Sequence, residues 1–174
     1  MEDFGTQVVP VIPRLRRYAR ALTGGHLIAD DLVQDTLERA WTKRYLWREG
    51  SDLRAWMFTV MHNVYVNQVR ARIADAVTPL DVEALNIPVR DNAADMLEVA
   101  DIDVALRKLP DDQREVLLLV ALEQLSYGET AAVLGIPVGT VMSRLFRARE
   151  RVRVLLGDAP VAAQATQTAL KVIK

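Results

Sequence analysis

Short polar and basic side chains recur along one side of the stretch 138–156, which has the apolar spacing of a helix. Arginine can pair with two acceptors on guanine, while serine and threonine reach base edges or phosphate oxygens. The chemistry that these residue types favour is recognition of DNA in the major groove. At about 100° per residue, five candidates share the side opposite the apolar seam: Thr140, Ser143, Arg144, Arg147 and Arg151.

Two helices joined by a tight break would position these side chains. Ser126 and Glu129 have the spacing of a capping box, which opens a short helix through Leu134. Gly135 supplies a left-handed cap for that helix, and Pro137 suits the first turn of the next. The pattern predicts a helix-turn-helix with 138–156 as its recognition helix. An ordinary hairpin with a solvated basic face is the alternative, and the Gly-x-Pro break favours DNA binding. The seam expected to pack inward is Val141, Leu145, Ala148, Val152 and Leu155.

Three amphipathic helices are expected earlier in the chain, at Gln7–Leu22, Ala29–Trp41 and Leu53–Arg72. The second has an apolar stripe that ends at Trp41 and a polar stripe on another face. That polar stripe is either a solvated surface or a docking surface for a basic partner. Its members, at i, i+3, i+4 and i+7, are Asp31, Gln34, Asp35 and Glu38.

The third helix carries an unusual polar face. Asparagine is a weak helix former, so several on one face hint at a surface that meets nucleic acid. The loop before this helix, Lys43–Asp52, combines cations with Tyr45 and Trp47, which could stack unpaired bases. Rings tucked into the core are the simpler interpretation of that loop. The polar face comprises Trp56, Thr59, Asn63, Asn67 and Arg70.

Charge is unevenly distributed along the 174 residues, although the net charge is only −1. Residues 1–72 hold 11 Lys/Arg and 8 Asp/Glu, whereas 73–99 hold 1 and 6. Separate basic and acidic surfaces are therefore expected. The chain has no cysteine, its N-terminus lacks a signal-peptide pattern, and its longest apolar run is Val116–Leu122. These features predict a soluble, cytoplasmic protein without membrane insertion.

The predicted fold class is all-α, with two small helical domains joined by a linker. Periodicity fades where prolines and carboxylates accumulate, and it resumes before the helix-turn-helix. The predicted parts are a first domain at 1–72, an acidic linker at 73–99, a second domain at 100–157 and a tail at 158–174.

Two blocks of sequence resemble the ECF-type (extracytoplasmic function) sigma factors, the promoter-recognition subunits of bacterial RNA polymerase. The first block contains DDLVQDT at 30–36 and LRAWMF at 53–58, with Asn63 seven residues after Trp56. The second contains LP at 109–110, LSY at 125–127 and PVGTVMSRLFRAR at 137–149. Their order, with a spacer between them, makes the resemblance specific.

The resemblance implies a partner or DNA element for each surface. The acidic stripe (Asp31, Gln34, Asp35, Glu38) would dock on the β′ clamp of core RNA polymerase, which the chain would also contact through β. The −10 element of promoter DNA would meet Trp47, Trp56, Asn63, Asn67 and Arg70. The −35 element would meet Thr140, Ser143, Arg144, Phe146, Arg147 and Arg151. Control by an anti-sigma factor is a further expectation from the family.

Two other functions remain open. A sigma-like decoy would sequester an anti-sigma factor without binding DNA, but it need not keep Arg144 and Arg147 on an outward face. A conventional helix-turn-helix regulator would leave the acidic stripe and the Trp/Asn face unexplained. Enzyme activity is not expected, nor is a cofactor or metal, because His26 and His62 are isolated and acidic pairs sit at helix starts.

Overall fold

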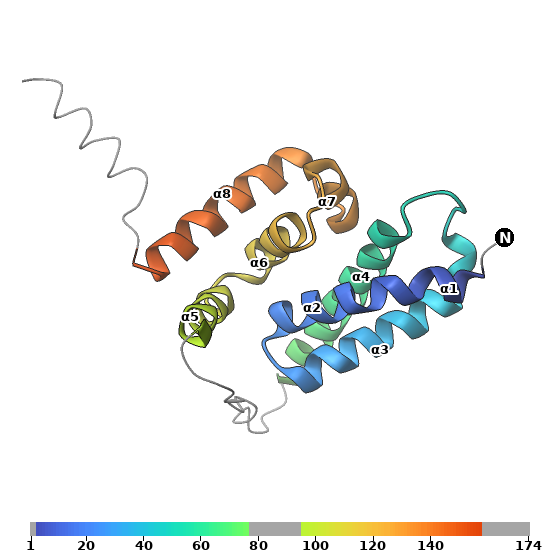
Figure 1. Ribbon diagram of the computed structural model, residues 1–174, viewed down its shortest axis with the longest axis horizontal. Helices are drawn as coiled ribbons and strands as arrows, with labels where there is room; N and C mark the ends of the chain where they lie inside the picture. The colour runs from blue at the N-terminus through green and yellow to red at the C-terminus, as the bar shows by residue number, and fades with distance from the viewer. Residues whose placement is uncertain (1–2, 77–94, 158–174) are drawn as a thin grey trace, which may run out of the picture.

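The computed structural model describes residues 3–76 and 95–157, and throughout these residues the secondary structure is helical, with no strand (Figure 1). The prediction of an all-α chain with two helical domains is confirmed. Most of the predicted linker, 77–94, and the predicted tail, 158–174, lie outside the described residues. In chain order the helices are α1 (Phe4–Val8), η1 (Val9–Val11), α2 (Ile12–Thr23), α3 (His26–Thr42), η2 (Arg44–Leu46), α4 (Leu53–Ala76), α5 (Asp95–Arg107), α6 (Asp111–Leu117), η3 (Leu118–Leu122), α7 (Tyr127–Leu134) and α8 (Val138–Leu155).

The N-terminal module, α1 to α4, is built from three long helices that pack side by side (Figure 1). Apolar residues at helical spacing give each helix one buried stripe. Gly24, with φ of 72°, ends α2 in the left-handed conformation and lets the chain turn into α3. The buried stripe of α2 is Leu15, Tyr18, Ala19 and Leu22.

Three details of this module differ from the sequence prediction. The expected first helix is divided into α1, η1 and α2, because Pro10 and Pro13 each lack a backbone N–H donor. The third helix continues to Ala76 instead of ending at Arg72. Trp41, expected on the buried stripe of α3, is 53 % exposed, and its ring lies tilted beside that of Phe4 at a centroid distance of 6.0 Å.

The C-terminal module, α5 to α8, contains a change of helix type that the apolar run at 116–122 did not reveal. The segment predicted as one helix, Gln113–Leu122, begins at Asp111 and becomes a π-helix at Leu118. The Glu123 N–H donates to the Leu118 carbonyl at 3.0 Å, a bond that spans five residues. Gln124 then adopts a left-handed φ of 57°.

The two modules share one hydrophobic core. α4 packs against α7, and α2 packs against η3, α5 and α6. Buried side chains continue from Leu15 and Phe58 of the N-terminal module to Leu119 and Leu125 of the C-terminal module. In this closed arrangement the modules are held by apolar packing, and they also make the polar contacts described below.

Phe58 offers a test of the core. Its ring is 1 % exposed and makes a T-shaped contact with the ring of Tyr18 at a centroid distance of 5.2 Å. Phe58→Ala is expected to lower the free energy of unfolding by about 3–5 kcal/mol, because it removes apolar burial and leaves a cavity. Urea denaturation measures the change. Tyr45→Ala, at a ring that is 76 % exposed, should shift stability by less than about 0.5 kcal/mol. Equal effects would contradict the assigned core.

Candidate nucleic-acid interface

The helix-turn-helix begins with the capping box predicted from Ser126 and Glu129. The Glu129 N–H donates to Ser126 Oγ at 3.2 Å, and the Ser126 N–H donates to Glu129 Oε2 at 2.7 Å. The Ser126 hydroxyl also donates to Glu129 Oε2 at 2.7 Å. The bond from this hydroxyl, followed by the bond from the Ser126 N–H, favours the ionised carboxylate and lowers the pKa of Glu129. The start of α7 is therefore fixed by two reciprocal bonds.

The turn between α7 and α8 follows the predicted break. Gly135 has a φ of 64° and caps α7 in the left-handed conformation. Pro137 lies one residue before the first helical residue, Val138, and so acts as the N-cap instead of entering the first turn. The two helices are bent by 102°, within the range of helix-turn-helix motifs.

The packing face of α8 is the predicted seam over its first three turns. Val141, Leu145 and Ala148 are buried against α6 and α7, whereas Val152 is half-buried and Leu155 is exposed. The apolar seam is therefore exposed to solvent toward the C-terminal end of α8. This packing holds the opposite side of α8 outward.

The predicted DNA-contacting side chains of α8 lie on that outward side. Ser143, Arg147 and Arg151 are exposed, and Phe146 exposes 65 % of its surface. Thr140 is half-buried at the start of the helix, where its carbonyl accepts a hydrogen bond from Ser143 Oγ at 3.1 Å. The structure brings these residues together, and their role in reading DNA stays a prediction.

Arg144 differs from its neighbours, because it is half-buried and engaged within the chain. Its Nε lies 3.2 Å from Asp112 Oδ2 at the start of α6. In the sequence Asp112 belongs to an acidic pair at a helix start, and helical periodicity does not reveal its contact with Arg144, 32 positions away. Asp112 thus orients the guanidinium of Arg144, part of which remains accessible to solvent.

The predicted −10 face of α4 has an exposed polar part and a half-buried aromatic part. Asn63, Asn67 and Arg70 are exposed. Trp56 and Trp47 are half-buried and meet the ring of Phe4 at centroid distances of 6.1 and 5.8 Å. Two alternatives were expected for the loop 43–52: aromatic rings packed into the core or rings exposed for stacking on bases. Trp47 follows the first, because it is half-buried, and Tyr45 follows the second, because it is exposed.

Phe4 organises this aromatic cluster and was not singled out from the sequence. A single phenylalanine before the first long helix carries no periodic signal, so nothing in the pattern identified it. The indole N–H of Trp47 is buried and has no hydrogen-bond partner among the described residues. A buried donor without a hydrogen-bond partner lowers the stability of the fold, so the indole N–H of Trp47 is an unfavourable feature of this face.

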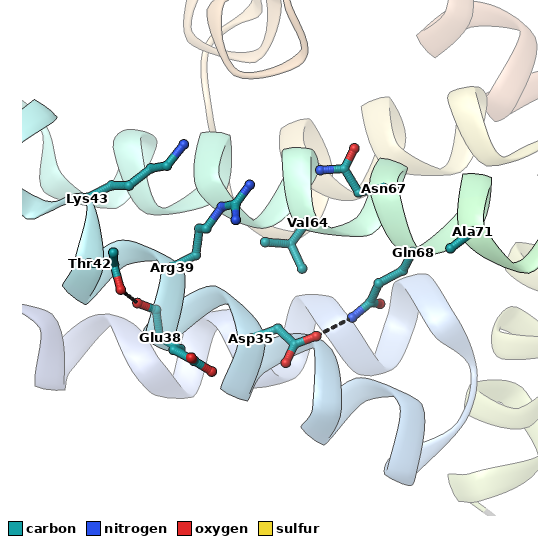
Figure 2. A pocket seen from close by; sticks show the side chains of 9 residues that line it. All are labelled: Asp35, Glu38, Arg39, Thr42, Lys43, Val64, Asn67, Gln68 and Ala71. Atoms are coloured by element: carbon teal, nitrogen blue, oxygen red, sulfur yellow. Dashed lines mark hydrogen bonds between the residues drawn. The ribbon is translucent and has the colours of Figure 1, made fainter.

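The acidic stripe of α3 is exposed as predicted. Asp31, Gln34, Asp35 and Glu38 all face solvent, and none of the three carboxylates forms an ion pair with a described residue. Figure 2 shows the groove between α3 and α4, in which Asp35 accepts a hydrogen bond from Gln68 at 2.7 Å. Asn67 lines the same groove, so the stripe and the polar face of α4 meet there.

The described residues contain no group of three His, Asp or Glu side chains that could hold a metal ion. Of the two histidines, His62 places its Nδ1 2.8 Å from Glu115 Oε1 at the contact between the modules, and His26 is exposed. Across residues 3–76 and 95–157, no single helix is long and apolar enough to cross a membrane. Helices α7 and α8 meet that test only as a bent pair.

Two helical modules, of which one ends in a helix-turn-helix with an outward basic face, define a DNA-binding protein of the sigma type. Family models agree for both parts: "Sigma2 domain of PhyR" matches residues 8–62, and "Sigma-70, region 4" matches residues 100–152. The chain belongs to the ECF RNA polymerase sigma factor family, whose members are not enzymes.

Three relatives illustrate the similarity. ECF RNA polymerase sigma factor EcfG of Rhodopseudomonas palustris is 38 % identical over 149 residues, which cover 86 % of this chain and 82 % of EcfG. The sigma factor RpoE of Bartonella quintana, solved in complex with the anti-sigma factor NepR, is 36 % identical with a TM-score of 0.75, covering 90 % of this chain and 98 % of RpoE. The anti-anti-sigma factor PhyR of Bartonella quintana, solved with NepR, shares the fold at 17 % identity and a TM-score of 0.60, covering 86 % of this chain and 49 % of PhyR.

Removal of the capping hydroxyl tests the local architecture. Ser126→Ala should lower the free energy of unfolding by about 1 kcal/mol at neutral pH. Because the folded pKa of Glu129 is lowered, the carboxylate stabilises the fold above its ordinary pKa, and this contribution is lost as pH falls through the folded pKa. The stability gap between wild type and variant, measured by urea denaturation, should therefore narrow in acid. Ser51→Ala serves as a control outside a capping box, and a gap independent of pH would contradict the account.

Proposed function

We propose that this chain binds core RNA polymerase in the cytoplasm and directs it to promoters, with α4 reading the −10 element and α8 the −35 element. One observation carries the proposal. Each module of this ECF family member presents an outward polar face, at Asn63, Asn67 and Arg70 on α4 and at Ser143, Arg147 and Arg151 on α8. These two faces would meet separate parts of a promoter.

The α8 face suits the major groove of double-stranded DNA. Its hydroxyl and guanidinium groups can reach base edges and phosphates, and the packed seam fixes their direction. Phe146 adds an exposed apolar ring that can contact a thymine methyl group. Arg144 would act with less freedom than Arg147, because Asp112 already holds one side of its guanidinium.

The α4 face suits bases that have left the double helix. Trp56 and Trp47 offer ring surface for stacking, and the asparagine amides can bond to base edges. Unstacking costs a few kcal/mol per base, which such contacts can offset. Arg70, one turn beyond Asn67, would hold a phosphate of the same strand.

The acidic stripe of α3 is the proposed docking surface for the β′ clamp, while β would be contacted elsewhere. Its carboxylates are exposed and unpaired within the described residues, so a basic partner could engage them without breaking an internal ion pair. Its proximity to Asn67 across the groove would place polymerase beside the −10 face (Figure 2).

Regulation by an anti-sigma factor is the final part of the proposal. RpoE, at 36 % identity, was solved bound to the anti-sigma factor NepR, and its coverage of both modules supports a comparable partner here. A decoy function is less well supported, because PhyR shares only the fold and Arg147 remains outward-facing. A conventional regulator would need no polymerase-docking stripe.

Transcription from a cognate promoter tests the proposed function. Promoters would be selected from genomic fragments with the reconstituted holoenzyme, and run-off transcripts would be measured with core polymerase alone and with core plus this chain. Promoter-specific transcripts that require the chain are expected. Their absence from all templates, with retention of an anti-sigma protein but no polymerase in a pull-down, would favour the decoy.

Arg147→Ala tests the −35 face. The variant holoenzyme should bind a promoter carrying the −35 element about 1–3 kcal/mol more weakly, because a base-reading guanidinium is lost. Quantitative gel shift measures this change. Arg149→Ala removes an equal charge from another side of α8 and should cost less. An unchanged affinity for Arg147→Ala would leave that residue with a structural role only.

Asp35→Lys tests polymerase docking. Reversal of one charge in the stripe should weaken binding to core polymerase at least tenfold, or about 1.4 kcal/mol, as measured by fluorescence titration. Because Asp35 is exposed, the circular dichroism spectrum should not change. Glu49→Lys makes the same charge change in an exposed loop and should bind core normally. Equal weakening by both variants would contradict a localised docking surface.

A further inference from the structure

A fully buried carboxylate lies where the two modules meet. Glu123 follows the π-helix η3 and is 0 % exposed. Its Oε1 accepts hydrogen bonds from Arg17 Nη2 at 2.9 Å and Nε at 3.3 Å. Its Oε2 lies 3.9 Å from Arg14 Nη1 and has no hydrogen bond. Burying a carboxylate that has one oxygen without a hydrogen bond costs free energy of folding, which points to a role for Glu123 other than stability.

Among residues 3–76 and 95–157, the charged partners of this carboxylate come from the opposite module. Arg14 and Arg17 both lie on α2. Arg54 on α4 donates to the backbone carbonyl of Glu123 at 3.3 Å, and its guanidinium pairs with Asp52 of its own module at 3.5 Å. Arg17 also reaches the Leu122 carbonyl at 3.2 Å. The unusual backbone around the residue, a π-helix before it and a left-handed Gln124 after it, turns Glu123 toward these arginines.

The closed arrangement is too small to reach both promoter elements. The −10 and −35 elements lie about 25 base pairs apart, or roughly 85 Å at 3.4 Å per base pair. A packed body of this length has a radius of gyration of about 16 Å and so a width of about 40 Å. The modules must therefore separate, and that movement withdraws Glu123 from its arginines.

Withdrawal leaves a basic site on the N-terminal module. Arginine binds carboxylate and phosphate through the same fork of N–H donors, so a site filled by a carboxylate can also accept a phosphate. Helix α2 continues this character, because it carries Arg14, Arg16, Arg17 and Arg20 and no acidic residue. A row of cations without acids suits the regular charge of a DNA backbone better than a single carboxylate of a protein partner.

We propose that Glu123 is an interdomain latch: in the closed chain its carboxylate occupies a phosphate-binding site made by Arg14 and Arg17, which takes a backbone phosphate of promoter DNA once the modules separate. The inference rests on the proposed promoter binding and adds a DNA contact outside the α4 and α8 faces. It also makes the closed chain a weak DNA binder, since the same arginines serve both states.

Opening of the full-length chain is measured first. Because the chain has no cysteine, Glu49→Cys and Arg149→Cys provide one dye site on each module for energy transfer. Glu123→Gln keeps the side-chain shape but removes the charge, and should lower the transfer efficiency. Glu150→Gln is the matched control, because it breaks an ion pair with Arg153 inside α8 alone. Arg17→Gln breaks the same ion pair at an exposed residue, and such a change should not disturb folding. Opening can therefore be tested with this variant even if Glu123→Gln folds poorly.

Binding to a mixed-sequence DNA duplex is measured next, over a range of salt concentrations. Glu123→Gln should bind about threefold to tenfold more tightly than wild type, with a salt slope steeper by about 0.9 for each phosphate engaged. Glu123→Gln combined with Arg17→Ala should remain open yet lose most of this gain, and its slope should fall by about one. Arg17→Gln alone should open without the gain.

Three results would overturn the latch. The first is unchanged energy transfer in both Glu123→Gln and Arg17→Gln. The second is opening of Glu123→Gln without tighter duplex binding, and the third is a gain in Glu123→Gln that survives loss of Arg17. Competition by poly-glutamate that exceeds competition by duplex at equal charge would assign the arginines to an acidic protein and also overturn the proposal. Run-off transcription by the wild-type chain is scored separately, so failure of the latch is distinguishable from failure of the sigma function.

Discussion

The packing of α2 and α4 against η3 and α7 is the constraint on which the other features depend. It continues one apolar core through both modules and surrounds the fully buried carboxylate of Glu123. Helix α4 packs against α7, and α8 packs against α6 and α7. The remaining sides of α4 and α8 face solvent, and those are the sides that carry the asparagines and the arginines. The closed chain thus leaves its proposed recognition faces free while it fixes the distance between them.

Basic and acidic residues lie on different surfaces of the protein, which explains how a chain with a net charge of −1 can serve as a DNA-binding subunit. The outward faces of α8 and α2 are basic, whereas the exposed stripe of α3 is acidic. An overall balance near zero therefore conceals one surface suited to phosphates and another suited to a basic protein. In a holoenzyme the polymerase would supply much of the remaining phosphate neutralisation.

Local features were predictable from sequence, and contacts between distant segments were not. The capping box at Ser126, the left-handed Gly135 and the buried Val141 and Leu145 each follow from residue types within a few positions, and the structure confirms them. The Arg144–Asp112 pair and the burial of Glu123 depend on how helices meet, which periodicity does not encode. For the same reason the exposed Trp41 was placed wrongly, and the resemblance identified the family more securely than it identified individual contacts.

The central claim is that two separate modules of one chain contact two separate promoter elements. Hydroxyl-radical cleavage from a probe tethered to a single introduced cysteine tests it most directly, with Arg149→Cys on α8 or Glu49→Cys beside α4, in a holoenzyme bound to a selected promoter. The account predicts cleavage centred near −35 from the α8 probe and near −10 from the other. Cleavage by both probes at one element, or at no defined position, would contradict it.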